Sequence, residues 1–234
     1  MDTDDAVAAT ESLVDQAARD RVTVSGADAQ AYLQSQLSQE VRDLGPGAAR
    51  WTFLLDPTGK IDVLARVQRT GDDVFVLDTD AGYGEAMLAR LDRFRIRVDV
   101  ETVLDAADGE PSMGHELARI AAGWPRMGHE IEPGSTIPVA TGLVRLAAST
   151  TKGCYPGQEL VERMDSRAAE APRSLRIVDL DSNPDRAPAV GDPIHDADGA
   201  EVGVLTSVAG EGGIGIGYVK RGADVGRLPD HATA

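Results

Sequence analysis

The stretch WTFLLDPTGKIDVLARVQRTGDDVFVL, residues 51–77, contains three apolar runs separated by two short polar segments. The segments Asp56-Pro57-Thr58-Gly59 and Thr70-Gly71-Asp72-Asp73 are made of residues that favour tight reversals of the chain. We therefore predict three successive antiparallel strands, at Trp51–Leu55, Ile61–Val67 and Val74–Leu77.

Helical patterns flank these strands on both sides. Before them, a strand at Arg21–Val24 leads into a helix that opens at Ser25 and runs to about Leu37. After them, a helix from about Gly84 to Phe94 precedes a strand at Arg95–Val100. This order of elements predicts an α+β fold, with antiparallel sheets and packed helices.

The second half of the chain is less regular. Residues 101–114 lose periodicity and predict a connector, and His115–Ala122 predicts a helix that ends at Gly123. From Gly191 onward, short apolar runs alternate with Gly and Asp turns, which predicts a small C-terminal β-barrel. We therefore divide the chain into residues 1–180, with a second subdomain at about 48–104, a barrel at 181–225 and a disordered tail at 226–234.

The chain is strongly acidic, with 39 Asp and Glu against 23 Lys and Arg and a net charge of −16. This charge argues against nucleic acid and anionic membranes as partners. The acidic N-terminus does not resemble a signal peptide, so we expect a cytoplasmic protein. Its one cysteine excludes an internal disulfide and cannot alone supply the ligands of a metal site, so we expect no stably bound metal.

That cysteine lies in the segment Lys152-Gly153-Cys154-Tyr155-Pro156-Gly157-Gln158-Glu159. The two glycines permit positive φ angles or close backbone approach, and Pro156 restricts the turn. A helix predicted from Gln158 to Asp165 would place its positive end near Cys154, and Lys152 adds a charge, so both favour the thiolate. The alternative is that Cys154 is a small buried apolar residue, as free cysteines usually are.

The segment Arg93-Phe94-Arg95-Ile96-Arg97-Val98 alternates arginine with apolar residues. If it is extended, its arginines share one face of a strand. Such a face is most often simply solvated. In a chain this acidic, the alternative is a basic face that receives an anionic small molecule through charge-assisted hydrogen bonds.

The cysteine segment resembles the K-G-C-Y-x-G-Q-E signature of the YgfZ family. These folate-binding proteins support iron-sulfur cluster assembly and repair and are related to the glycine-cleavage T-protein. Other segments are similar in the same order along the chain: Val24–Ala29, Tyr32–Leu37, Leu55–Lys60, Arg93–Val98, Arg119–Gly123, Gly128–Ile131 and Gly191–Arg221. The resemblance implies three subdomains in a ring, with tetrahydrofolate near the centre and the cysteine loop close to it.

The resemblance also implies roles for individual residues. Cys154 and Lys152 become the catalytic candidates, and Gly153, Tyr155, Gly157, Gln158 and Glu159 complete the motif. Candidates for contacts with folate are Asp62, Arg95, Arg97, Glu116 and Arg119. The implied cofactor is tetrahydrofolate, and the implied partners are folate and the iron-sulfur assembly machinery or its client proteins.

Two departures from the family pattern define the alternatives. The T-protein carries an Asp-Asp pair after its glycine turn, but here Asp62 is followed by Val63. We therefore expect an accessory factor rather than a classical enzyme, the alternative being a folate-dependent aminomethyl or one-carbon transferase. Family members also carry several dozen more residues between Val100 and His115. The folate pocket is then open on that side or closed by a second copy of the chain, as a homo-oligomer; otherwise the chain is a shortened scaffold without folate.

Overall fold

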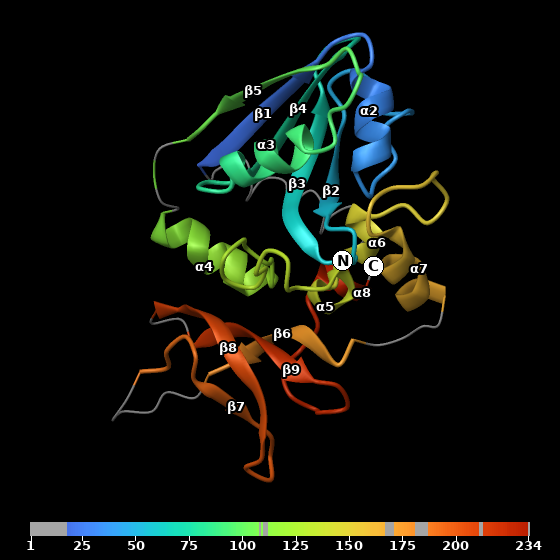
Figure 1. Ribbon diagram of the computed structural model, residues 1–234. Coiled ribbons are helices and arrows are strands. Elements are labelled where there is room, and N and C mark those ends of the chain that lie inside the picture. Colours follow the sequence, from blue (N-terminus) through green and yellow to red (C-terminus); the bar gives the residue numbers. More distant parts are fainter. Residues whose placement is uncertain are drawn as a thin grey trace.

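The computed structural model describes residues 18–107, 109, 112–166, 171–180, 187–210 and 213–233. These residues form two antiparallel sheets, one of five strands and one of four. Figure 1 shows the larger sheet with its helices at the top, the smaller sheet at the bottom and helix α4 between them. Antiparallel sheets with packed helices confirm the predicted α+β class.

The larger sheet has the strand order β2-β3-β4-β1-β5. Its strands are β1 (Arg19–Ser25), β2 (Ala49–Leu55), β3 (Ile61–Arg69), β4 (Val74–Asp80) and β5 (Glu101–Asp105). The strands predicted around residues 51–77 are thus present and paired in succession. Strand β1 inserts between β4 and β5, so the predicted subdomain at 48–104 shares one sheet with the N-terminal strand.

Helices α2 (Ala29–Gln36) and α3 (Gly84–Asp92) bury their apolar residues against one face of this sheet. Leu33 of α2 and Met87 and Leu91 of α3 are fully buried there. Met87 and Leu91 are four residues apart and so share one face of α3, and burial of such a face supplies most of the stability of short helices.

The opposite face of strands β2 and β3 is buried as well. Consecutive side chains of a strand point to opposite faces, and both strands bury apolar residues on each of their faces. Trp51, Phe53 and Leu64 therefore pack against a second core formed by residues 124–161. That region contains the short helices α5 (Pro138–Thr141) and α6 (Val144–Ala147), and the start of α7 (Gln158–Ser166).

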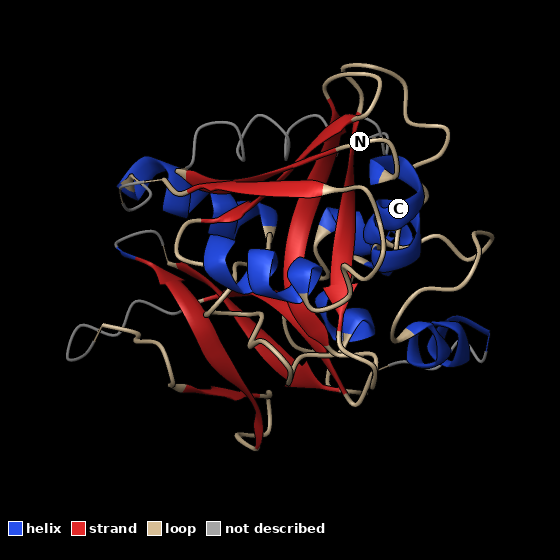
Figure 2. Ribbon diagram, turned by 45° about the horizontal axis from the view of Figure 1, so that its top comes forward, coloured by secondary structure: helices blue, strands red, loops and turns tan. Residues whose placement is uncertain are grey.

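The smaller sheet has the order β6-β9-β8-β7. Its strands are β6 (Arg173–Asp179), β7 (Pro193–His195), β8 (Glu201–Ala209) and β9 (Ile214–Lys220). Helix α4 (Met113–Ala122) packs on it through Ile120, and helical segments lie between the two groups of strands (Figure 2). The sheet confirms the predicted C-terminal β unit, but β6 and β7 are its open edges and do not close a barrel.

Two sequence predictions about residues 93–114 were wrong. Residues 93–100 form turns rather than a strand, because Arg95 donates a hydrogen bond to the Val100 carbonyl at 2.9 Å and Arg97 has a φ of 56°. Ile96 is 70% exposed, so the alternation of arginine and apolar residues does not reflect a buried face. The strand instead lies at Glu101–Asp105, within the predicted connector.

The C-terminal boundaries also differ from the prediction. Strand β6 begins at Arg173, so the smaller sheet starts before residue 181. Residues 226–233 are ordered rather than a disordered tail, because the backbone of Arg227 pairs with Ile177 and α8 (Asp230–Thr233) carries the buried His231. Residues 181–186, at the start of the predicted barrel, lie outside the described residues. Among the described helices, none has the length and apolar character needed to cross a bilayer.

Candidate functional site

The cysteine loop connects helices α6 and α7, and it presents an exposed thiol. Cys154 is a free, exposed cysteine, so the alternative of a buried packing residue is wrong. The next residue, Tyr155, is only 7% exposed and belongs to the second core. The loop thus buries one side chain as an anchor and leaves the neighbouring thiol accessible to reagents or partners.

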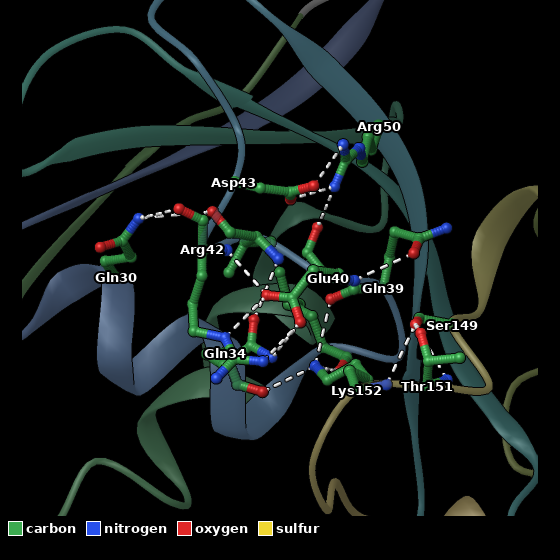
Figure 3. A network of polar contacts seen from close by, with 12 residues as sticks. Gln30, Gln34, Gln39, Glu40, Arg42, Asp43, Arg50, Ser149, Thr151 and Lys152 are labelled. Atoms are coloured by element: carbon green, nitrogen blue, oxygen red, sulfur yellow. Dashed lines mark hydrogen bonds and ion pairs between the residues drawn. The ribbon is translucent and has the colours of Figure 1, made fainter.

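Lys152 is buried and fully used by the fold. Its Nζ donates hydrogen bonds to the carbonyl oxygens of Gln34 at 2.7 Å, Leu37 at 2.6 Å and Gln39 at 3.1 Å. Figure 3 shows this side chain reaching the chain around Gln34 and Gln39, at the end of α2. An ammonium group has three donors, so none remains for the thiol. Lys152 therefore holds the loop, and its ammonium group has no donor left for a hydrogen bond to Cys154.

The environment of this ammonium group is only partly favourable. Burial lowers the pKa of Lys152 to about 8. The carbonyl groups at the C-terminal end of α2 carry the negative end of the helix dipole and stabilise the charge. The Tyr155 ring, whose centroid lies 5.2 Å from Nζ, provides a cation–π contact in addition. The loop and α2 are thus joined by one buried cation.

The two glycines of the motif differ in what they do. Gly157 has a φ of 79°, and a Cβ at this position would lie 2.5 Å from the Asp56 carbonyl oxygen. A Cβ at Gly59 would likewise lie 2.4 Å from the Leu160 Cβ. The cysteine loop therefore packs closely against the turn between β2 and β3. A Cβ at Gly153 would meet no atom within 4 Å, so the predicted steric need is confirmed only at Gly157.

The last two motif residues begin helix α7. The Gln158 Oε1 accepts a hydrogen bond from the Tyr155 amide at 3.2 Å, and its Nε2 donates to Glu162. Gln158 therefore ties the loop to the first turn of the helix. Glu159 is exposed to solvent beside it.

Asp62 forms a polar cluster with a residue that the sequence reading missed. The Arg90 Nε lies 3.4 Å from the Asp62 Oδ2, and Arg90 also donates to the Leu55 carbonyl and to Gln36. Burial raises the pKa of Asp62, although the nearby Arg90 opposes the shift. The Asp62 side chain stays 29% exposed, so it is a half-buried carboxylate that a ligand can reach. The sequence signal that could have indicated Arg90 is its position three residues after Met87, which places it on the buried face of the helix.

Arg119 belongs to a separate, buried network. All five of its N–H donors are used: Nε and Nη2 bond to Glu116, Nη1 to the Trp124 carbonyl and Glu130, and Nη2 also to Ser207. Hydrogen bonds and charge from Arg119 outweigh burial and lower the pKa of Glu116. This network joins α4 to β8 and uses every donor of Arg119, while the Glu116 side chain stays 27% exposed.

Arg95 and Arg97 are exposed in the turn between α3 and β5. Arg95 forms an ion pair with Asp92 at 3.0 Å. Within the described parts of the chain, no hydrogen bond or ion pair links these arginines to Asp62 or Arg119. The five predicted folate contacts therefore form three separate groups. In the same parts of the chain, no three His, Cys, Asp or Glu side chains converge to hold a metal ion.

Sequence comparisons find relatives of this chain. Residues 4–109 match the model of the GCVT N-terminal domain. An uncharacterized protein of Haemophilus influenzae is 29% identical over 187 residues, which cover 63% of this chain and 66% of that protein. The tRNA-modifying protein YgfZ of Enterobacter sp. is 27% identical over 240 residues, covering 74% of this chain and 72% of that protein. The chain thus spans just under two thirds of the Haemophilus protein.

The fold has a known counterpart. The crystal structure of the glycine cleavage system aminomethyltransferase T from Bartonella henselae matches with a TM-score of 0.72 at 16% identity, covering 91% of this chain and 81% of that one. At this identity the likeness concerns the fold. The domain match, the YgfZ relative and this fold together show that the chain is similar to YgfZ-like and GcvT-like proteins.

Proposed function

We propose that this chain is a folate-binding accessory factor for iron-sulfur cluster assembly or repair, in which Cys154 is a ligand or redox thiol during cluster delivery. The observation that carries the proposal is the exposed Cys154 thiol on a loop that Lys152, Tyr155 and Gly157 hold in place. A thiolate is the usual protein ligand of such clusters. One cysteine cannot hold a cluster alone, so the client protein supplies the remaining ligands during transfer.

Asp62 is the residue that best fits tetrahydrofolate. A carboxylate accepts hydrogen bonds from the amino edge of a pterin, and the buried Arg90 fixes the position of this one. Bound tetrahydrofolate supplies a carrier for one-carbon groups. The role of this chain is then to bind and orient the pterin next to the turn on which the cysteine loop rests.

The transferase alternative receives less support. Val63 is fully buried among the residues under α2 and α3. A single carboxylate therefore faces the proposed pterin site at this point of the strand. Aminomethyl transfer needs a positioned acid or base at the reacting folate nitrogen, and a second carboxylate is missing here.

Folate binding is tested first. The purified protein should retain a folate that is detectable by absorbance and mass, and tetrahydrofolate should raise the melting temperature. Asp62→Asn should weaken binding about tenfold or more, because it removes a charge-assisted hydrogen bond. Glu85→Gln, an exposed change on α3, is the control. Absence of bound folate and of any thermal shift at saturating ligand would favour a shortened scaffold instead.

The role of the thiol is tested in cells that lack this protein. Cys154→Ala should abolish the rescue of iron-sulfur enzyme activity, while the melting temperature stays within a few degrees because the side chain is exposed. Normal rescue by this variant would remove the cysteine from the proposed function. Turnover of an aminomethyl donor with tetrahydrofolate would support the transferase instead.

A further inference from the structure

A cleft lies where the C-terminal segment meets the smaller sheet. It has a volume of about 200 Å³ and is lined by residues of α5, of β6, of the turn after β9 and of residues 228–232. None of these residues belongs to the cysteine loop or to the Asp62–Arg90 cluster. Ligand pockets for drug-sized molecules are usually about 300–1,000 Å³, so this cleft suits a smaller molecule.

The charge of the cleft is opposite to that of the chain. Two arginines, Arg176 and Arg221, line it, and none of its described lining residues is acidic. The whole chain has 39 acidic residues against 23 basic ones, so this local arrangement differs from the average surface. A cleft of one sign of charge concentrates ligands of the other sign.

Both guanidinium groups keep donors available. Arg176 donates one hydrogen bond through Nε, to the Ser174 hydroxyl at 3.3 Å. In the described parts of the chain, its terminal nitrogens and the whole guanidinium of Arg221 have no hydrogen-bond or ion-pair partner. This differs from Arg119, whose donors are all used by the fold. A planar guanidinium with free donors matches the geometry of a carboxylate or phosphate.

Apart from Ser174, the rest of the cleft is lined by apolar residues and glycines. Val139, Ala140, Leu175 and Leu228 contribute hydrocarbon walls. A bare inorganic ion would leave these walls in contact with water, whereas a short hydrocarbon chain would bury them. The lining therefore combines an anion-binding end with space for a few carbon atoms.

We propose that this cleft is a binding site for a small organic anion, a carboxylate or phosphate that carries a short apolar chain. Its anionic group contacts Arg176 and Arg221, and its hydrocarbon part contacts the walls from α5 and the C-terminal segment. This site is independent of the proposed folate function.

Titration calorimetry with sodium pentanoate, and separately with inorganic phosphate, tests the site at constant ionic strength. Pentanoate should bind saturably at one site, and more tightly than phosphate. Arg176→Gln and Arg221→Gln should each weaken pentanoate binding about tenfold or more, since each removes a charge-assisted contact. Arg173→Gln is the matched control, because Arg173 is exposed on the same strand and does not line the cleft.

A second variant checks the location without removing an arginine. Leu228→Asp places a carboxylate at the rim of the cleft, where Leu228 is 37% exposed, so the fold should tolerate it. The added charge should repel pentanoate and weaken its binding at least as much as the loss of one arginine. Equal binding by this variant and the wild type, equal effects of Arg173→Gln and Arg176→Gln, or tighter binding of phosphate than of pentanoate would overturn the proposal.

Discussion

Within the cysteine motif, some residues hold the loop in place and another presents an exposed thiol. Cys154 is exposed, whereas Lys152 and Tyr155 are buried and Gly157 fills a position that admits no side chain. Closeness in the sequence therefore does not show which motif residues interact with the reactive thiol. Lys152 is only two residues from the thiol but directs its charge into the end of α2.

The two motif glycines give a direct test of this division. Gly157→Ala should lower the free energy of unfolding by roughly 2 kcal/mol or more, since an alanine there has an unfavourable φ and meets the Asp56 carbonyl. Gly153→Ala should change it by less than about 0.5 kcal/mol, because the position is open. Chemical denaturation measures both. Equal changes in unfolding free energy for the two variants would mean that the cysteine loop does not pack against the turn between β2 and β3.

Lys152→Met keeps the length of the side chain and removes its three hydrogen bonds. We expect a loss of about 2–4 kcal/mol in unfolding free energy, because three carbonyl groups at the end of α2 lose their shared donor. Lys220→Met is the control, since Lys220 makes one exposed contact with the Glu201 carbonyl and should change stability by less than about 1 kcal/mol. A neutral Lys152→Met would contradict the anchoring role.

At the scale of elements, strands with strong apolar patterns and clear turns could be predicted from sequence. The strands around residues 51–77 and the helix ended by Gly123 are examples, because their signals are local. The turn at Arg93–Arg97 was mistaken for a strand, because Arg95, Ile96 and Arg97 alternate as they would in a strand. These residues lie instead in a hydrogen-bonded turn. Contacts such as that of Arg90 with Asp62 join segments that are distant in the sequence, so no local sequence pattern predicts them.

The C-terminal segment was missed for the same reason, and its anchor is a titratable group. His231 packs edge-on against Trp124, with ring centroids 5.3 Å apart, and its Nε2 lies 3.4 Å from the Thr141 carbonyl oxygen. Burial lowers the pKa of His231 to about 4, although Thr141 and Asp230 oppose this shift. The ring is therefore neutral in the folded protein at pH 7.

The pH dependence of stability follows from this shift. Between pH 6.5 and 4 the unfolded chain binds a proton at His231 that the folded chain does not, so acidification through this window removes stability. We expect the wild type to lose roughly 3 kcal/mol more than His231→Phe over this range. Urea unfolding at several pH values measures the difference, and carboxylates titrate alike in both proteins. Parallel pH curves would refute a buried neutral His231.

Across the whole molecule, the Arg119–Glu130 ion pair joins α4 and the segment after it to the smaller sheet. Glu130 is 1% exposed and accepts hydrogen bonds from Arg119, Thr206 and Ser207, while Arg119 belongs to α4. Helix α4 lies between the two sheets (Figure 1). Loss of the ion pair would leave a buried charge with fewer partners where α4 meets the smaller sheet.

Glu130→Gln should therefore destabilise the protein by roughly 3 kcal/mol, because it breaks a buried ion pair by changing one partner. Glu132→Gln, two residues away and exposed, should change stability by less than about 0.5 kcal/mol. Thermal and urea unfolding of the two variants give the comparison. A Glu130→Gln protein as stable as the control would mean that apolar packing alone holds α4 on the smaller sheet.

The burial of strands β2 and β3 on both faces has a consequence during protein synthesis. One face can pack as soon as α3 has left the ribosome, but the face with Trp51, Phe53 and Leu64 needs residues 124–161. Those residues are made up to roughly a hundred positions later, which at about 5–20 residues per second is a delay of about 5–20 seconds. During this interval the nascent chain exposes this apolar surface of Trp51, Phe53 and Leu64. The rate of translation between β3 and α7 therefore determines how long a chaperone must protect the surface.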